Sequence, residues 1–152
     1  MTRWTTAALV AALALTGLTA CSDDDTPSSV ASKVASAASR AGDAVASATA
    51  EAGRRFDDIK NGVDAKDAVR LGTPATASDG RTAVEVRAAN GADSAKSFAV
   101  QVDFTDGSGK LLDAVVVTVR DVPAGGTGKG TARSTHDLSG DVRAKVSRAV
   151  RY

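Results

Sequence analysis

Hydrophobic positions change their spacing twice along the chain, and each change predicts a different kind of element. Residues 7–15 are continuously apolar, residues 27–61 carry an apolar side chain every three or four positions, and from about residue 67 apolar and polar residues alternate. A period near 3.6 is typical of an amphipathic helix, whereas a period of two is typical of half-buried strands. The pattern therefore predicts three segments, which cover residues 1–20, 21–66 and 67–152.

The first segment has the composition of a secretory signal. Arg3 is the only charged residue before Asp23. The apolar run between them is shorter than the roughly 20 residues that a helix needs to span a bilayer. A basic start, a short apolar core and small residues before a cleavage site are typical of a signal peptide. We therefore expect residues 1–20 to be removed and the mature chain to be exported.

The only cysteine of the chain stands at the end of this signal, in the motif formed by Leu18, Thr19, Ala20 and Cys21. The motif resembles the lipobox of bacterial lipoproteins. The resemblance implies that the Cys21 thiol carries diacylglycerol and that the chain is cut before it. Two acyl chains give a stable anchor where one would not. We expect a protein held at the outer face of the cell membrane; the alternative is an unmodified cysteine buried in an N-terminal helix.

Residues 21–66 predict a short acidic linker followed by one long alanine-rich helix. Thr26 suits an N-cap and Pro27 suits the first helical position, where its missing N–H costs nothing. Gly62 is a suitable left-handed C-cap, so we expect the helix to cover residues 27–61.

The sequence does not decide what this helix packs against. The apolar stripe runs from Val30 to Val63, and many of its members are alanine, so little area is available for burial in each turn. One interpretation is a spacer between the lipid and the domain. A second is a helix docked by its C-terminal third onto the domain or onto another copy. A third is a helix lying on the membrane surface, which the acidic composition of the segment disfavours.

Residues 67–152 predict a small antiparallel β-sandwich, because short alternating segments are separated by turn signals such as Asp79-Gly80. Phe98 and Phe104 share one face of their segment with two valines. The segment over residues 111–119 is apolar on both faces, as expected of a central strand covered on both sides. We expect strands over residues 69–71, 82–88, 98–104, 111–119, 128–134 and 142–150.

The order of these features resembles a known family. Residues 97–106 read Ser-Phe-Ala-Val-Gln-Val-Asp-Phe-Thr-Asp, and a Gly109-Lys110 hairpin, an apolar strand and Val122-Pro-Ala-Gly125 follow. This order resembles the FxLYD-type immunoglobulin-like modules of bacterial surface lipoproteins, in particular actinobacterial lipoproteins with an alanine-rich stalk. The resemblance covers residues 67–152 and implies an immunoglobulin-like sandwich. Phe104 stands where the family pattern often has tyrosine, and no catalytic residues are assigned in that family.

Composition narrows the possible chemistry. A single cysteine and a single histidine, His136, exclude an intrachain disulfide, a thiolate metal cage and an HExxH site. The glycine-rich stretch at residues 125–131 lacks the glycine and hydroxyl spacing of a phosphate loop. We therefore expect no enzymatic activity, no metal and no cofactor apart from the acyl chains on Cys21.

The charge pattern leaves one candidate binding surface. The 19 basic and 18 acidic residues balance, and exported chains do not meet nucleic acid, so we expect no nucleic-acid partner. Basic residues gather at the end of the chain, however. If Arg133, Arg143 and Lys145 share a face, they form a patch for anionic lipid or envelope polymer. The alternative is a solvated strand face that discourages aggregation. The expected partner is otherwise an unknown envelope protein or polymer.

Overall fold

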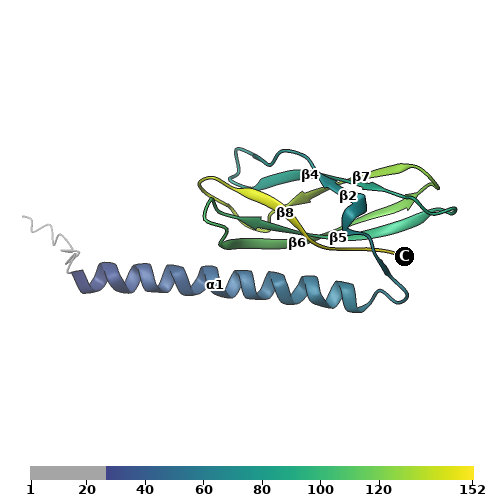
Figure 1. Cartoon of the computed structure of the whole chain (residues 1–152). Helices are drawn as coiled ribbons and strands as arrows, with labels where there is room; N and C mark the ends of the chain where they lie inside the picture. The colour runs from purple at the N-terminus through teal and green to yellow at the C-terminus, as the bar shows by residue number, and fades with distance from the viewer. Residues whose placement is uncertain (1–26) are drawn as a thin grey trace, which may run out of the picture.

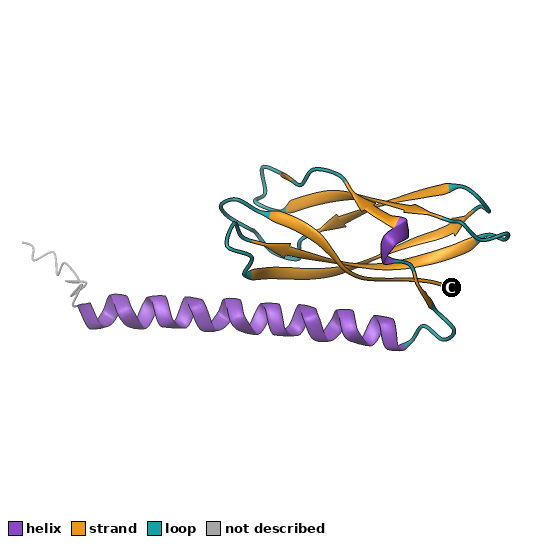
Figure 2. Cartoon of the chain, viewed as in Figure 1, coloured by secondary structure: helices purple, strands orange, loops and turns teal. Residues whose placement is uncertain are grey.

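Two antiparallel sheets and one long helix make up the part of the chain that the computed structural model describes (Figures 1 and 2). The structure describes the backbone of residues 27–152 and the side chains of residues 39–152. The expected signal peptide, the lipobox at residues 18–21 and the Thr26 N-cap lie outside the described residues. The described part is mainly β, and its two sheets pack against each other as a sandwich.

The strands follow the alternation of the sequence closely. The first sheet has the order β1 (Val63–Asp64), β8 (Arg143–Arg151), β5 (Lys96–Thr105) and β6 (Leu111–Val122). In the second sheet, β4 (Thr82–Ala89) pairs with β2 (Val69–Leu71), β3 (Ala75–Thr76) and β7 (Thr127–Arg133). A 3₁₀ turn, η1 (Lys66–Ala68), precedes β2. The chain enters the first sheet with β1, crosses to the second with β2, β3 and β4, and returns to the first with β5 and β6. It then crosses to the second sheet with β7 and ends in the first with β8.

The core lies between the two sheets and is built by the predicted faces of the strands. Phe98 and Phe104 of β5 are fully buried, as are Val84 and Val86 of β4. In β4 the intervening residues, such as Arg87, face outward, as expected for a strand with one buried face. In β5 the intervening residues Ala99 and Asp103 are buried as well, so both faces of this strand are covered. The sandwich begins earlier than the expected boundary at residue 67, because β1 pairs with β8 and Ala65 is already part of the core.

Strand β6 corrects one expectation about the sheet. It is an edge strand and not a central one, since it pairs only with β5. Its two apolar faces have different partners: Val119 contributes to the core, whereas Ala114 is buried on the opposite face. The cover of that outer face is the helix α1 (Pro27–Asp57), which runs alongside the first sheet (Figure 1).

Helix α1 is packed on the sandwich along its C-terminal half. Ala52 and Phe56 are only 2% and 3% exposed, and Val45 and Ala48 are half-buried, as is Ile59 just after the helix. Across from them, the small side chain of Ala114 in β6 lets the helix approach closely. Over this half, α1 is therefore a docked element and not a free-standing spacer. Its N-terminal end runs past the sheets (Figure 1).

The end of the helix also differs from the expectation. Helix α1 stops at Asp57, four residues before the expected end, and Asn61 supplies the left-handed residue with a φ of 61°. Gly62 has a different role, because a Cβ there would lie 3.1 Å from Ile59 Cγ2 and 3.2 Å from Val150 Cγ1. Val63, placed in the helical stripe by its spacing, lies in β1 and is exposed.

Candidate functional site

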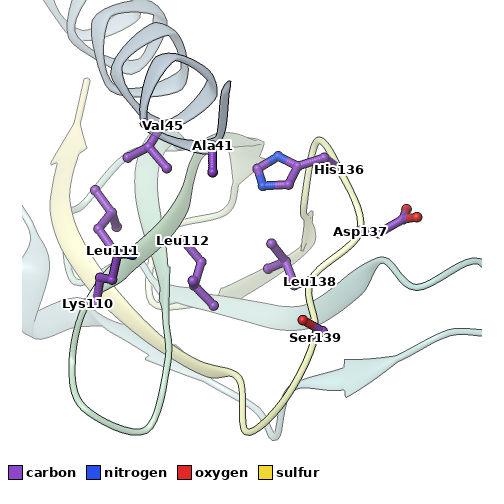
Figure 3. A pocket seen from close by; sticks show the side chains of 10 residues that line it. Ala41, Val45, Lys110, Leu111, Leu112, His136, Asp137, Leu138 and Ser139 are labelled. Carbon is purple, nitrogen blue, oxygen red and sulfur yellow. The ribbon is translucent and has the colours of Figure 1, made fainter. Parts of the chain in front are cut away.

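A cleft of about 550 Å³ lies where α1 passes over one end of the sandwich (Figure 3). Three segments line it: Ala41, Gly42 and Val45 of the helix, the start of β6, and the loop between β7 and β8. Its apolar side chains from the sandwich are Leu111, Leu112 and Leu138, and Figure 3 shows them gathered beneath the helix. The volume falls within the range of about 300–1,000 Å³ that is usual for small-molecule sites.

The loop that forms one wall of the cleft is held by buried polar contacts. The carboxylate of Asp113, which is fully buried, accepts hydrogen bonds from the Thr135 amide at 2.6 Å and the Thr135 hydroxyl at 3.0 Å. The amide of Leu138 donates to the Gly80 carbonyl at 2.9 Å. Because both contacts tie the loop to neighbouring strands and turns, the position of Leu138 is fixed before any ligand arrives.

One cationic side chain, that of Lys110, lies at the cleft without a compensating ion pair in the described part of the chain. Lys110 and His136 line it, and the described residues contain no ion-pair partner for Lys110. Among the described residues, Asp137 is the only acidic one that lines the cleft, and its side chain points away from the helix (Figure 3). It lies against Gly80, where an added Cβ would come within 3.0 Å of the Asp137 Cβ. The site is therefore apolar inside and basic at its rim.

The surroundings of His136 do not form a nucleophile–base pair. The Ser134 hydroxyl donates to the His136 carbonyl at 2.7 Å and accepts from the Thr82 amide at 3.0 Å. Both contacts hold the backbone of the loop, so the hydroxyl is not presented to the imidazole. The ring instead has its Nδ1 3.2 Å from the Thr135 hydroxyl and 3.8 Å from the Asp113 carboxylate. This geometry orients the ring at the rim of the cleft.

The glycine-rich stretch near residue 128 has a packing role. A Cβ on Gly128 would lie 2.5 Å from side-chain atoms of both Val119 and Val122, and one on Gly130 would lie 2.7 Å from Val117. These glycines let the backbone of β7 approach the side chains of β6 across the sandwich. Their clustering in the sequence is therefore explained by close contact between the two sheets.

The three basic residues of the expected patch do not share a sheet. Arg133 lies in β7 of the second sheet and forms an ion pair with Asp79. Arg143 and Lys145 lie in β8 of the first sheet, where Arg143 is 3.3 Å from the carboxylate of Asp141. The side chains of Arg143 and Lys145 are both exposed. Arg133 thus lies in a different sheet from the other two, although it lines a small hollow together with Ala114 of β6.

Several exposed carboxylates are stabilised in their charged form. A hydrogen bond from the Ser108 hydroxyl, followed by the Lys110 amide, holds the pKa of Asp106 below its ordinary value. The Arg81 amide lowers the pKa of Asp79 most, and Arg133 adds to the effect. These groups complete turns at the surface and take no part in the cleft.

The residues that line the cleft were missed by the sequence analysis because they come from three distant segments. Two weak signals were present. Leu111 and Leu112 are adjacent at the start of a strand, where one of them must leave the core face, and Leu138 is a lone leucine among Ser, Asp and Gly. Neither signal indicates by itself which helix residues lie above.

Comparison with known proteins finds no matching family, no matching curated protein and no matching solved structure. Within residues 27–152, no helix is both long and apolar enough to cross a membrane. The same described part of the chain contains no group of three His, Cys, Asp or Glu side chains placed to hold a metal ion. Functional assignment therefore depends on the residues of this chain alone.

Proposed function

We propose that the protein is an exported lipoprotein that is held at the outer face of the cell membrane by acyl chains on Cys21. The observation that carries this proposal is the motif Leu18-Thr19-Ala20-Cys21, which follows a basic and then apolar leader and precedes three aspartates. A leader of this kind directs export, and a doubly acylated cysteine gives stable anchoring.

The sandwich is, in this proposal, a non-enzymatic interaction module of the FxLYD-type immunoglobulin-like class. The strand pairing supports this view: β4 pairs with β7 and β5 pairs with β8, so each sheet is completed by a strand that returns from the other one. Such crossed connections are typical of Greek-key sandwiches, to which immunoglobulin-like domains belong. The use of the Ser134 hydroxyl in loop contacts supports a binding role in place of catalysis.

The anchor is tested by metabolic labelling with radioactive palmitate in cells that produce the wild-type chain or its Cys21→Ala variant. We expect label on the wild-type chain and none on the variant, and we expect the wild-type chain in the membrane fraction with its leader removed. Ala20→Leu serves as a second variant, because a large side chain before the cleavage site should block processing while the thiol remains. Equal labelling of wild type and Cys21→Ala would refute the proposal.

An alternative function is binding of an anionic envelope polymer or lipid through the basic face of β8. The exposed side chains of Arg143 and Lys145 on the first sheet favour it. Pelleting of the protein with anionic vesicles or cell wall, at low and high salt, tests this function. We expect Lys145→Gln to weaken pelleting and Arg133→Gln, on the other sheet, to leave it unchanged. Salt-independent absence of binding would remove this alternative.

A further inference from the structure

We propose that the cleft beneath α1 binds a single-chain amphiphile with an anionic head, of the long-chain carboxylate class. The contact would be made by Val45, Leu111, Leu112 and Leu138 with the chain, and by Lys110 and His136 with the head. This inference goes beyond the lipid anchor, because it is argued from described residues of the cleft and does not require acylation of Cys21.

The apolar part of the ligand follows from the lining of the cleft. Leu111 and Leu112 remain half-buried, and both line the same open volume as Val45 of the helix. Leu138 is 6% exposed and belongs to the hydrophobic core, so it forms a fixed part of the cleft wall. The other three aliphatic side chains surround a space that they do not fill, and an alkyl chain would remove the remaining exposed surface of Val45, Leu111 and Leu112 from water.

The anionic head follows from charge complementarity at the rim. Lys110 and His136 line the cleft, and Asp137, the single acidic lining residue in the described part of the chain, is turned away against Gly80 (Figure 3). A carboxylate at the rim would meet Lys110, which has no ion-pair partner among the described residues. A cationic head would meet the like charge of Lys110 at this position.

An alkyl chain fits the lining better than a peptide does. A peptide segment would bring amide and carbonyl groups into an interior formed by Val45, Leu111, Leu112 and Leu138, where few polar groups are available to pair with them. The polar groups of the cleft lie at its rim, so they suit a ligand with one polar end. The ligand that fits the cleft is therefore a free monomeric amphiphile and not a membrane surface.

The test uses the full-length chain with Cys21→Ala, which has no acyl chain of its own to compete for the cleft. Laurate is titrated into the labelled protein, and backbone amide resonances are followed by NMR. We expect shifts at residues 41–45, 110–112 and 136–139. In a series of shorter carboxylates, each methylene removed should weaken binding about fourfold, as for burial of one methylene group.

Gly42→Leu is the blocking variant, because a Cβ at Gly42 meets no atom within 4 Å and the added side chain enters the cleft without removing any contact. We expect it to weaken laurate binding by about tenfold or more, as for insertion of methylenes into an occupied space. Gly53→Leu is the matched control, since Gly53 also lies in α1 with open space around its Cβ but does not line the cleft. It should bind laurate as the parent chain does.

Lys110→Glu tests the head group separately, and folding is not at risk because Lys110 is exposed. We expect it to weaken laurate binding by about fivefold and to leave binding of the neutral dodecanol unchanged. The inference is overturned if laurate shifts none of the cleft amides or if Gly42→Leu binds it as well as Gly53→Leu. It is also overturned if only anionic vesicles bind, in a manner sensitive to Lys145→Gln and not to Gly42→Leu.

Discussion

The guanidinium carbon of Arg148 lies 4.5 Å from the centre of the Phe56 ring. This cation–π contact joins strand β8 to helix α1, and the ring itself is almost fully buried against the first sheet. Burial of this ring against the sheet stabilises the helix more than the intrinsic helix propensity of its alanine-rich sequence does. The C-terminal half of α1 is therefore part of the folded unit, and the cleft exists because this half stays in place.

Phe56→Ala is expected to release the helix from the sheet. Truncation of a buried phenylalanine typically costs about 3–5 kcal/mol. An alanine-rich helix without a partner is only marginally stable in water. Native-state hydrogen exchange should therefore show faster exchange for the amides of α1, with little change in the core strand β5. Ala50→Ser, at an exposed position of the same helix, is the control.

The contribution of the Arg148 contact is separable from that of burial. A double-mutant cycle of Arg148→Gln and Phe56→Leu keeps an apolar side chain on the helix and removes only the pairing of charge and ring. We expect a coupling of about 0.5–1 kcal/mol, the usual value for such pairs near a surface. If the α1 amides of Phe56→Ala exchanged as slowly as those of the parent chain, docking of the helix through Phe56 would be contradicted.

The sequence pattern predicts which residues share a face of each strand. It does not predict which element covers that face. Phe98 and Phe104 of β5 were expected in the core and lie there, because a period of two decides the face of each residue in a strand. The two apolar faces of β6 were also recognised. The second cover is α1 and not another strand layer, and local pattern cannot distinguish these two covers.

The basic patch and the cleft could not be predicted correctly from the sequence, because both depend on contacts between distant segments of the chain. Arg133 was grouped with Arg143 and Lys145 because all three are near the end of the chain. Strand β7 crosses to the second sheet, however, so neighbouring strands in sequence present their side chains on different sheets. The cleft was missed for a related reason, since its walls come from positions about 70 and 100 residues apart that meet only after α1 docks.

The glycines of this chain should respond to alanine in opposite directions. Gly42→Ala and Gly53→Ala add a Cβ where no atom lies within 4 Å, inside a helix. Each is expected to stabilise α1 by about 1 kcal/mol, the usual difference between the two residues in a helix interior. Gly128→Ala and Gly130→Ala force a Cβ into contacts shorter than 3.0 Å, and each is expected to cost about 1–3 kcal/mol.

Thermal and denaturant unfolding of the four single variants checks this series. The strand variants should lower the midpoint of global unfolding. The helix variants should act mainly on protection of the α1 amides against hydrogen exchange. If Gly128→Ala were as stable as the parent chain, the close approach of β7 to β6 would have to be abandoned.

Asp113 is expected to be a structural carboxylate of the loop between β7 and β8. Asp113→Ala leaves the amides of Ala114 and Thr135 without their side-chain acceptor in a buried place. A buried donor left without a partner typically costs about 1–3 kcal/mol. Asp141→Ala, an exposed position at the same end of the sandwich, should leave stability unchanged. Chemical denaturation measures both, and equal effects would remove the special role of Asp113.

The lowered pKa of Asp106 predicts how stability depends on acid. Its carboxylate accepts hydrogen bonds from Ser108 and Lys110 only in the folded chain, so the folded pKa lies below the ordinary value of 3.8. For such a group, the stabilising contribution is complete above the unfolded pKa and is lost as pH falls through the folded one. We therefore expect the free energy of unfolding to decrease as pH falls below about 4, where the unfolded chain binds the proton first.

Asp106→Asn isolates this contribution, because the amide oxygen can still accept from the turn but carries no charge to titrate. Its unfolding free energy should decline less steeply below pH 3.8 than that of the parent chain, and the two curves should run parallel at neutral pH. Asp93→Asn is the matched control, since Asp93 is exposed and no hydrogen bond holds its carboxylate in the described part of the chain. A slope that Asp93→Asn alters as much as Asp106→Asn would assign the acid sensitivity to overall charge and not to this turn.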